Sequence, residues 1–185
     1  TGSWRSFIRW GPPGVGKTTL AQIVAKTLDR PFYTLSAVTS GVKDVREVID
    51  KAKRQHLFNA RPAFLFIDEI HRFNKSQQDS LLGAVEQGVI TLIGATTENP
   101  SFEVISPLLS RCQVYVLKPM EDADLDTLLQ RALTTDEELL KRNIEVKEKE
   151  ALFRFSGGDA RKLLNILDIV VGATDGDIVI DDERV

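Results

Sequence analysis

Short apolar runs alternate with amphipathic segments along the first two-thirds of the chain. The apolar runs predict strands at residues 7–10, 32–35, 63–67, 90–94 and 114–117. Between the strands, apolar residues recur at intervals of three and four, which predicts helices at residues 17–29, 42–52 and 76–86. Strands that alternate with helices indicate a parallel sheet with helices on both of its faces. This part of the sequence therefore predicts an α/β fold.

The pattern changes after Pro119, where strand-like runs give way to leucine-rich segments with helical spacing. We therefore expect a hinge at Pro119 and Met120, between a core at residues 1–118 and a small helical domain at residues 119–185. Two features of the second part are less regular. A charged run and the C-terminal piece predict a solvated helix face or loop at residues 141–150 and a short strand within residues 177–185.

Composition and charge narrow the class of protein. The 185 residues are 42% hydrophobic, and no apolar run approaches the roughly 20 residues of a membrane-spanning helix. No signal-peptide pattern occurs and Cys112 has no second cysteine to pair with, so we expect a soluble cytoplasmic protein without membrane contact. The net charge of −3 means that any nucleic-acid contact must come from a local patch or from an assembled ring.

A glycine-rich segment joins the first predicted strand to the first predicted helix. It matches the phosphate-binding loop pattern and comprises Gly11, Pro12, Pro13, Gly14, Val15, Gly16, Lys17, Thr18 and Thr19. The glycines let backbone N–H groups turn toward one anion, and the following helix adds its positive N-terminal end. We expect Lys17 to reach the β- and γ-phosphates of a nucleotide and Thr18 to ligate Mg²⁺. An ordinary glycine-rich turn is the weaker interpretation, because the pattern lies between a strand and a helix, as it requires.

Two adjacent carboxylates follow the predicted strand at residues 63–67. A parallel strand delivers Asp68 and Glu69 to the carboxyl edge of the sheet, where ligands bind in open α/β folds. We expect Asp68 to hold Mg²⁺ and Glu69 to orient or deprotonate the water that attacks the γ-phosphate. The alternative, a pair of acids that caps the next helix, is less favoured beside a phosphate loop.

Polar residues also follow the fourth predicted strand at the same edge. The Thr97 hydroxyl or the Asn99 amide is a candidate hydrogen-bonding partner of the γ-phosphate or the attacking water. A turn whose side chains bond to its own backbone explains these residues equally well. The local sequence leaves the choice between Thr97 and Asn99 open.

Other polar residues receive plainer interpretations. We predict that His71 packs or hydrogen-bonds rather than acting as a catalyst, and that His56 lies at the surface. Arg72 and Lys75 are predicted to solvate the start of a helix, in preference to contacting DNA phosphates in a central channel. No spacing of histidine, cysteine and acidic residues predicts a zinc site.

Taken together, these motifs resemble AAA+ ATPases of the clamp-loader clade. The resemblance rests on the phosphate loop, on Asp-Glu-Ile-His-Arg-Phe at residues 68–73, and on Ser-Arg-Cys at residues 110–112. Three longer stretches are more specifically similar to the MgsA/RarA replication-associated recombination proteins, relatives of the Werner-helicase-interacting protein. These stretches are residues 35–43, 75–82 and 95–102.

The resemblance implies a P-loop AAA+ core followed by a helical lid, and a DNA-dependent ATPase that uses ATP and Mg²⁺ in replication-fork maintenance, recombination and repair. It implies that Arg111 is an arginine finger inserted into a neighbouring subunit's site, and that Arg161 in the lid contacts phosphate. It further implies a homotetramer that meets DNA ends, gaps or forks and single-stranded-DNA-binding protein. The family's segment before the first strand and its C-terminal oligomerisation domain are not expected in this chain.

Alternative functions remain open at this point. A branch-migration motor of the RuvB type shares the acidic motif and Gly-Ala-Thr-Thr at residues 94–97, but it is not expected to carry residues 98–102. A nucleotide-gated scaffold would bind ATP without useful hydrolysis, and Glu69 argues against it. Arg9 is a departure from the apolar residue that the family more often carries in this strand.

Overall fold

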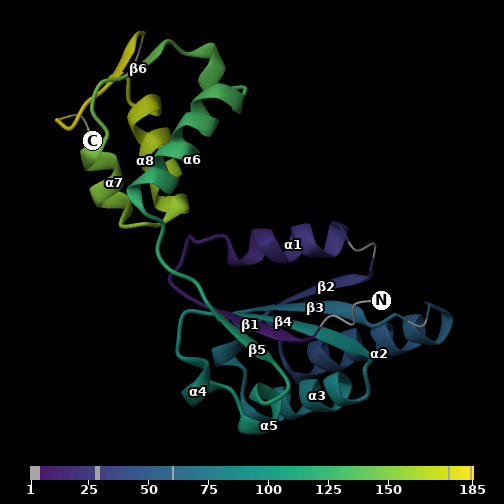
Figure 1. Ribbon diagram of the computed structural model, residues 1–185. Coiled ribbons are helices and arrows are strands. Elements are labelled where there is room, and N and C mark those ends of the chain that lie inside the picture. The colour runs from purple at the N-terminus through teal and green to yellow at the C-terminus, as the bar shows by residue number, and fades with distance from the viewer. Residues whose placement is uncertain (1–4, 28–29, 60, 175, 184) are drawn as a thin grey trace. The chain divides into compact units, whose positions relative to one another are not determined.

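The computed structural model describes residues 5–27, 30–59, 61–174, 176–183 and 185 (Figure 1). The chain divides into two compact units. The first comprises Thr1–Gly11 and Lys17–Leu117, and the second comprises Pro12–Gly16 and Lys118–Val185. The phosphate loop thus leaves the first unit after Gly11 and returns to it at Lys17.

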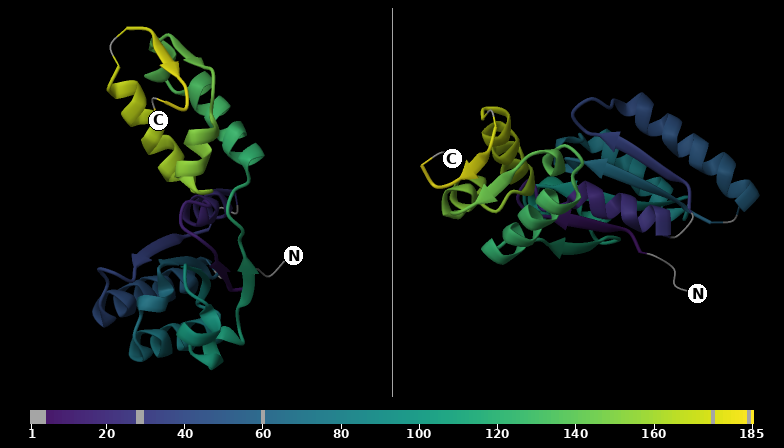
Figure 2. Two further views of the ribbon diagram at one scale, coloured as in Figure 1. Left: turned by 90° about the vertical axis from the view of Figure 1, so that its left-hand side faces the viewer. Right: turned by 90° about the horizontal axis from the view of Figure 1, so that it is seen from above.

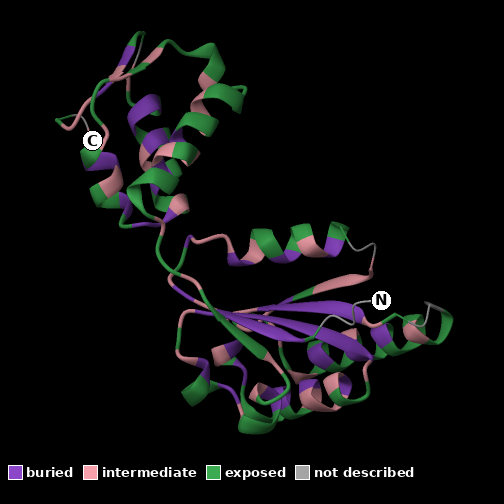
Figure 3. Cartoon of the chain, viewed as in Figure 1, coloured by how far each residue is buried: buried purple, intermediate pink, exposed green. Residues whose placement is uncertain are grey.

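The first unit is built on a parallel sheet with the strand order β2-β3-β4-β1-β5. Its strands are β1 (Phe7–Trp10), β2 (Phe32–Ser36), β3 (Ala63–Asp68), β4 (Ile90–Thr96) and β5 (Gln113–Val116), which lie side by side in Figures 1 and 2. β3, β4 and most of β1 are buried, whereas β5 is exposed along its length (Figure 3). Every predicted strand is present, and β4 extends two residues beyond its predicted end.

Helices cover both faces of this sheet, as the sequence predicts. One face carries α1 (Lys17–Thr27), and the other carries α2 (Val42–Asn59) and α3 (Lys75–Glu86) (Figure 1). Side chains alternate between the faces, since Phe64 and Phe66 pack in the cluster of α1, while Leu65 and Ile67 pack with α2 and α3. The shorter elements are η1 (Ile70–Arg72), α4 (Pro100–Glu103) and α5 (Ser106–Leu109). The α/β fold is thereby confirmed.

The second unit combines helices with a small sheet. Its elements are α6 (Asp122–Thr135), η2 (Leu139–Lys141), β6 (Ile144–Val146), α7 (Glu150–Ser156), α8 (Ala160–Gly172) and β7 (Ile178–Ile180). Leucines of α6, α7 and α8 share one apolar core with residues of β7. No helix in the described ranges is long and apolar enough to cross a bilayer.

Two predictions from the sequence need correction. The charged run at residues 141–150 is neither wholly loop nor a helix face, because Ile144 and Val146 form β6 and pack on the core while Glu145 points outward. β6 pairs in parallel with β7, which is the short strand predicted near the C-terminus. His56 is not a surface residue: it is partly buried, and its Nδ1 has no hydrogen-bond partner among the described residues.

Candidate nucleotide-binding site

Backbone geometry explains the glycines of the phosphate loop. A Cβ at Gly11 would lie 2.6 Å from the Leu117 carbonyl oxygen, closer than real side chains approach. Gly14 and Gly16 have φ values of 74° and 78°, a region that glycine adopts readily. A Cβ at Gly14 would also meet the carboxylate of Asp159, and Gly14 O accepts a hydrogen bond from Ala160 N at 3.2 Å. Positions 11 and 14 therefore require glycine for steric reasons, and positions 14 and 16 favour it for their backbone conformation.

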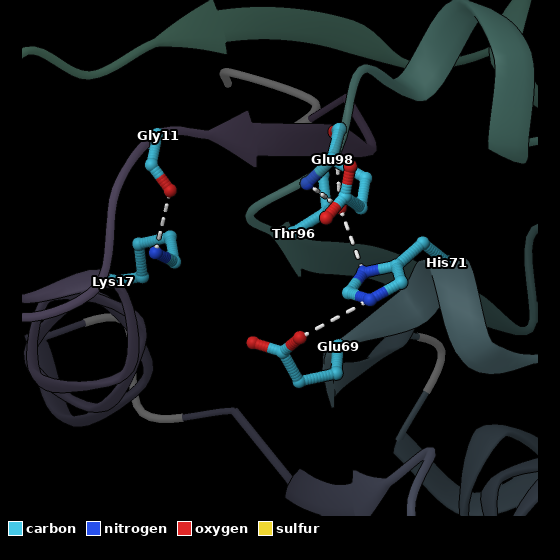
Figure 4. Close-up of polar contacts among 6 residues, drawn as sticks. All are labelled: Gly11, Lys17, Glu69, His71, Thr96 and Glu98. Carbon is cyan, nitrogen blue, oxygen red and sulfur yellow. Dashed lines mark hydrogen bonds and ion pairs between the residues drawn. The ribbon is translucent and has the colours of Figure 1, made fainter.

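Lys17 is the first residue of α1, and its side chain folds back over the loop. Its Nζ donates a hydrogen bond to the Gly11 carbonyl oxygen at 2.9 Å, and the residue is buried (Figure 4). The ammonium is thus turned back toward the end of β1 rather than into solvent. Its role in reaching a phosphate stays a prediction.

The acidic pair lies at the carboxyl end of β3, between β2 and β4 in the sheet. Asp68 is the last residue of β3 and pairs with Ser36 at the end of β2. Glu69 follows with φ 55° and ψ 44°, and it is the one non-glycine residue with positive φ in the described part of the chain. This left-handed turn ends the strand and redirects the Glu69 side chain along the sheet edge, where its carboxylate meets η1.

A hydrogen-bonded chain links Glu69 to the end of β4. Glu69 Oε2 lies 3.3 Å from His71 Nε2, and His71 Nδ1 lies 2.9 Å from Thr96 Oγ1 (Figure 4). Thr96 is fully buried, and its hydroxyl oxygen also accepts from Glu98 N at 3.0 Å. The single hydrogen of the Thr96 hydroxyl has two acceptors within reach, His71 Nδ1 and the Glu98 carbonyl oxygen at 3.1 Å. When this hydrogen points to His71 Nδ1, neutral His71 carries its own hydrogen on Nε2 and donates it to Glu69. The carboxylate is then oriented by a partly buried network that is anchored on the fully buried Thr96.

The sequence placed His71 among hydrogen-bonding residues but did not connect it to Glu69, and it did not single out Thr96. The candidates Thr97 and Asn99 follow Thr96 along the chain. Asn99 Oδ1 accepts from Ser101 N at 3.0 Å and caps α4, so its side chain has the local backbone role that was weighed as the alternative. The role of Thr97 stays a prediction.

The two candidate arginines have different surroundings. Arg111 is half-exposed after α5, where its guanidinium pairs with Glu86 at 2.5 Å and donates to the Pro107 carbonyl oxygen at 2.7 Å. Arg161 is exposed in the first turn of α8, where its backbone N donates to Asp159 Oδ1 at 2.8 Å. Asp159 therefore caps α8. The catalytic roles of both arginines stay predictions.

Arg9, which the sequence left unexplained, is a buried support of the phosphate loop. It is only 4% exposed, its Nη1 donates to the Lys17 carbonyl oxygen at 2.7 Å, and its guanidinium lies 5.2 Å from the centroid of the Phe7 ring. Burial lowers the pKa of Arg9 from its ordinary value. The side chain thus ties β1 to the first residue of α1. A charged residue inside an apolar strand was the available signal.

Comparison with known proteins places this site in a family. The family model described as "ATPase family associated with various cellular activities (AAA)" matches residues 7–120, which is more than half of the chain. The chain therefore belongs to the AAA family of ATPases, and the resemblance predicted from its motifs is confirmed at this level.

Within that family, the chain is similar to proteins named replication-associated recombination protein A. The protein of that name from Coxiella burnetii is 48% identical over 187 residues, which cover 98% of this chain and 42% of that protein. The one from Escherichia coli K12 is 45% identical over 179 residues, covering 95% of this chain and 40% of the relative. ATPase WRNIP1 of Dictyostelium discoideum is 51% identical over 170 residues, covering 91% of this chain and 19% of that protein. These likenesses confirm the more specific resemblance.

A solved structure gives the same architecture. The Thermotoga maritima RuvB Holliday junction branch migration motor matches with a TM-score of 0.74 and 29% identity, over 97% of this chain and 59% of that one. Identity to the recombination proteins is higher, which favours the main interpretation over the RuvB-type alternative. The chain spans less than half the length of the curated relatives described above.

Proposed function

We propose that this chain is the ATP-hydrolysing part of a DNA-dependent ATPase that acts in replication-fork maintenance, recombination and repair. The observation that carries the proposal is the Glu69–His71–Thr96 chain, at the same edge of the sheet as the phosphate loop. A scaffold that only binds nucleotide needs no oriented carboxylate there. The names of the similar proteins supply the biological setting of replication and recombination. We further propose that the protein acts in the cytoplasm.

The residues present fit a nucleotide with Mg²⁺. Loop N–H groups and Lys17 would hold the phosphates, while Thr18 and Asp68 offer one hydroxyl and one carboxylate to the ion. The described residues include no group of three or more histidine, cysteine or acidic side chains that could hold a metal. Such a sparse set suits Mg²⁺, which keeps waters and substrate phosphates in its shell. Bound Mg²⁺ neutralises charge that develops on the phosphates.

In the proposed hydrolysis, the oriented carboxylate of Glu69 acts as the general base. Its free carboxylate oxygen would accept a hydrogen from the attacking water, while the other oxygen stays fixed by His71. Thr96 holds His71 and is itself held by the backbone of Glu98. The Glu69 carboxylate that aligns the water is thus already held in position before the reaction begins.

A complete site would require a second subunit. Arg111 would leave Glu86 and enter the neighbouring site, where its planar charge suits a transferring phosphoryl group. Arg161 would contact phosphate from the second unit, acting as a lid. We further propose that the full-length protein is a homotetramer that meets DNA ends, gaps or forks and single-stranded-DNA-binding protein.

Mixing experiments test the shared site. Arg111→Ala and Lys17→Ala proteins should each lose ATP hydrolysis by roughly 10³-fold, the size of effect seen for arginine fingers. Mixed oligomers should regain activity, because some sites then combine an intact loop with an intact finger. Full activity of Arg111→Ala alone would contradict a finger acting between subunits.

The test of the function is steady-state ATP hydrolysis by the full-length protein, alone and with single-stranded, blunt duplex, gapped or forked DNA. Glu69→Gln serves as the blank. Stimulation by DNA ends or gaps above this blank is the expected result. Turnover that is indifferent to every DNA would contradict DNA dependence, and turnover equal to the blank would favour the nucleotide-gated scaffold.

A further inference from the structure

The second half of α2 and the turn after it carry an unusual concentration of positive charge. Residues 51–61 contain four of the chain's 24 lysines and arginines and none of its 27 acidic residues. Lys51, Lys53, Arg54 and Arg61 are all exposed, and none takes part in the ion pairs found among the described residues. This segment therefore concentrates positive charge on a chain whose net charge is negative, with the acidic residues of α2 confined to the turns before it.

Two large apolar side chains stand beside these cations. Leu57 is 83% exposed and Phe58 is 88% exposed, adjacent to each other near the end of α2. Two adjacent exposed apolar groups bordered by cations offer a surface that a partner with both apolar and negatively charged parts could cover. We call Lys51, Lys53, Arg54, Leu57, Phe58 and Arg61 the cationic patch.

The cationic patch lies away from the nucleotide edge of the sheet. α2 ends at Asn59 and β3 begins at Ala63, so the patch is at the amino edge. The opposite end of α2 starts at Val42, shortly after Ala37, whose N donates to the carbonyl oxygen of Asp68 at 3.0 Å. The 18 residues of α2 make the separation between the two ends about 27 Å.

Neighbouring residues extend the positive region. A cleft of about 670 Å³ beside β2 is lined by Lys26, Arg30 and Phe32, among others. Arg30 donates from Nη2 to Thr91 Oγ1 at 3.0 Å, and burial together with the nearby charge of Arg61 lowers its pKa. Cations that lie close enough to perturb one another indicate a strong local potential.

We propose that the cationic patch binds single-stranded DNA. Flexible lysine and arginine side chains follow a phosphate backbone without fixed pairing geometry, and an exposed phenylalanine offers a flat face on which an unpaired base stacks. A duplex would engage the charges but offer no open base face to Phe58. A protein partner would instead need a pocket with an acidic rim for Leu57 and Phe58. The inference deepens the proposed function, because it assigns the DNA contact to the edge opposite the ATP site.

Fluorescence anisotropy of full-length protein with a labelled oligothymidylate of about 16 nucleotides tests the proposal. Phe58→Ala should weaken binding about 10-fold without altering its dependence on salt, because stacking releases no counterions. Arg54→Glu should weaken binding and flatten the plot of log affinity against log salt by about 0.7 for each lost phosphate contact. A salt dependence that changes in Arg54→Glu but not in Phe58→Ala is expected when one residue contacts phosphate and the other stacks on a base.

Matched controls come from the same chain. Phe102 is 84% exposed on α4, and Arg46 is exposed in the first half of α2, where acidic residues surround it. Phe102→Ala and Arg46→Glu should leave binding within about 2-fold of the parent, a change too small for the loss of a stacked base or a phosphate contact. Circular dichroism checks that every variant is folded.

The outcomes separate this inference from the proposed function. Binding that depends on the patch, in a protein whose ATPase ignores DNA, would support the patch and contradict DNA-dependent turnover. Oligonucleotide binding that is unchanged in Phe58→Ala and Arg54→Glu would overturn the inference, even if DNA stimulates ATP hydrolysis. The better candidate for binding the cationic patch would then be a protein partner whose acidic-rimmed pocket accepts Leu57 and Phe58.

Discussion

The two edges of the sheet differ in how their polar side chains are held. At the carboxyl edge, Lys17, Glu69, His71 and Thr96 each have a partner within hydrogen-bonding or ion-pairing distance. At the amino edge, the exposed cations of the patch have no ion-pair partner among the described residues. Transfer of a phosphoryl group requires fixed positions, whereas binding a flexible polyanion does not. The fold separates an ordered reaction site from an adaptable surface by the length of one helix.

The most damaging change at the ordered edge is Glu69→Gln. It keeps the size and one hydrogen-bonding oxygen of the side chain but removes the charge that activates water. We expect kcat to fall about 10³-fold while nucleotide binding persists, because general-base catalysis contributes on this scale. Hydrolysis assays and nucleotide titration measure the two effects separately. Unchanged turnover would contradict the assigned role of Glu69.

The reactivity of Cys112 tests how accessible the amino edge of the sheet is outside the cationic patch. It immediately precedes β5, and burial raises the pKa of its thiol from 9.0 to about 12. Because the thiolate is the reactive form, modification at pH 8 should be about 100-fold or more slower in the folded than in the unfolded protein. The unfolded chain loses this proton first, so the free energy of unfolding should fall between pH 9 and about 12 and not below. Rapid labelling of the folded protein at pH 8 would show that this edge is open.

Thr96→Val tests whether the network at the ordered edge matters beyond Glu69 itself. The change leaves His71 Nδ1 and Glu98 N without their common partner in a buried place. We expect unfolding to become easier by about 1–3 kcal/mol. Turnover should fall roughly 10-fold, less than after loss of the base. Thr97→Val is the comparison, because Thr97 is the other threonine proposed to act at this edge. A larger loss of turnover in Thr97→Val than in Thr96→Val would favour Thr97 as the hydrogen-bonding partner of the γ-phosphate or the attacking water.

Arg9 gives the smallest expected effect. Arg9→Leu removes a buried charge and its hydrogen bond but retains apolar volume against Phe7, so the free energy of unfolding should change by about 1 kcal/mol or less. Arg9→Ala should cost more, about 2–3 kcal/mol, because it leaves a cavity. Chemical denaturation compares the two. Equal losses would show that the hydrogen bond to Lys17, rather than packing, is what Arg9 contributes.

Sequence patterns predicted the sheet well because its central strands are buried on both faces. Phe7–Trp10 was predicted with its bounds as observed, and the phosphate loop and acidic pair follow their strands as expected. β4 was predicted to stop at Gly94 but continues to Thr96. Thr96 therefore fell outside the predicted strand, and its partner His71 is brought to it only by the fold.

Contacts between distant segments were beyond local patterns. The partnership of His71 with Glu69 depends on the left-handed conformation of Glu69, which periodicity does not reveal. β6 was hidden in a charged run because its strand is three residues long and is completed by β7, more than thirty positions later. The reason for an arginine at position 9 of the strand is equally non-local, because its guanidinium donates to the carbonyl oxygen of Lys17.

The left-handed backbone at Glu69 also bears on protein engineering. A side chain in this conformation costs roughly 1–2 kcal/mol, which glycine avoids. A library screened only for thermal resistance should therefore accept glycine at position 69 and discard the catalyst with it. Attempts to increase the thermal stability of this enzyme by such selection would have to exempt position 69, where stability and turnover favour different residues.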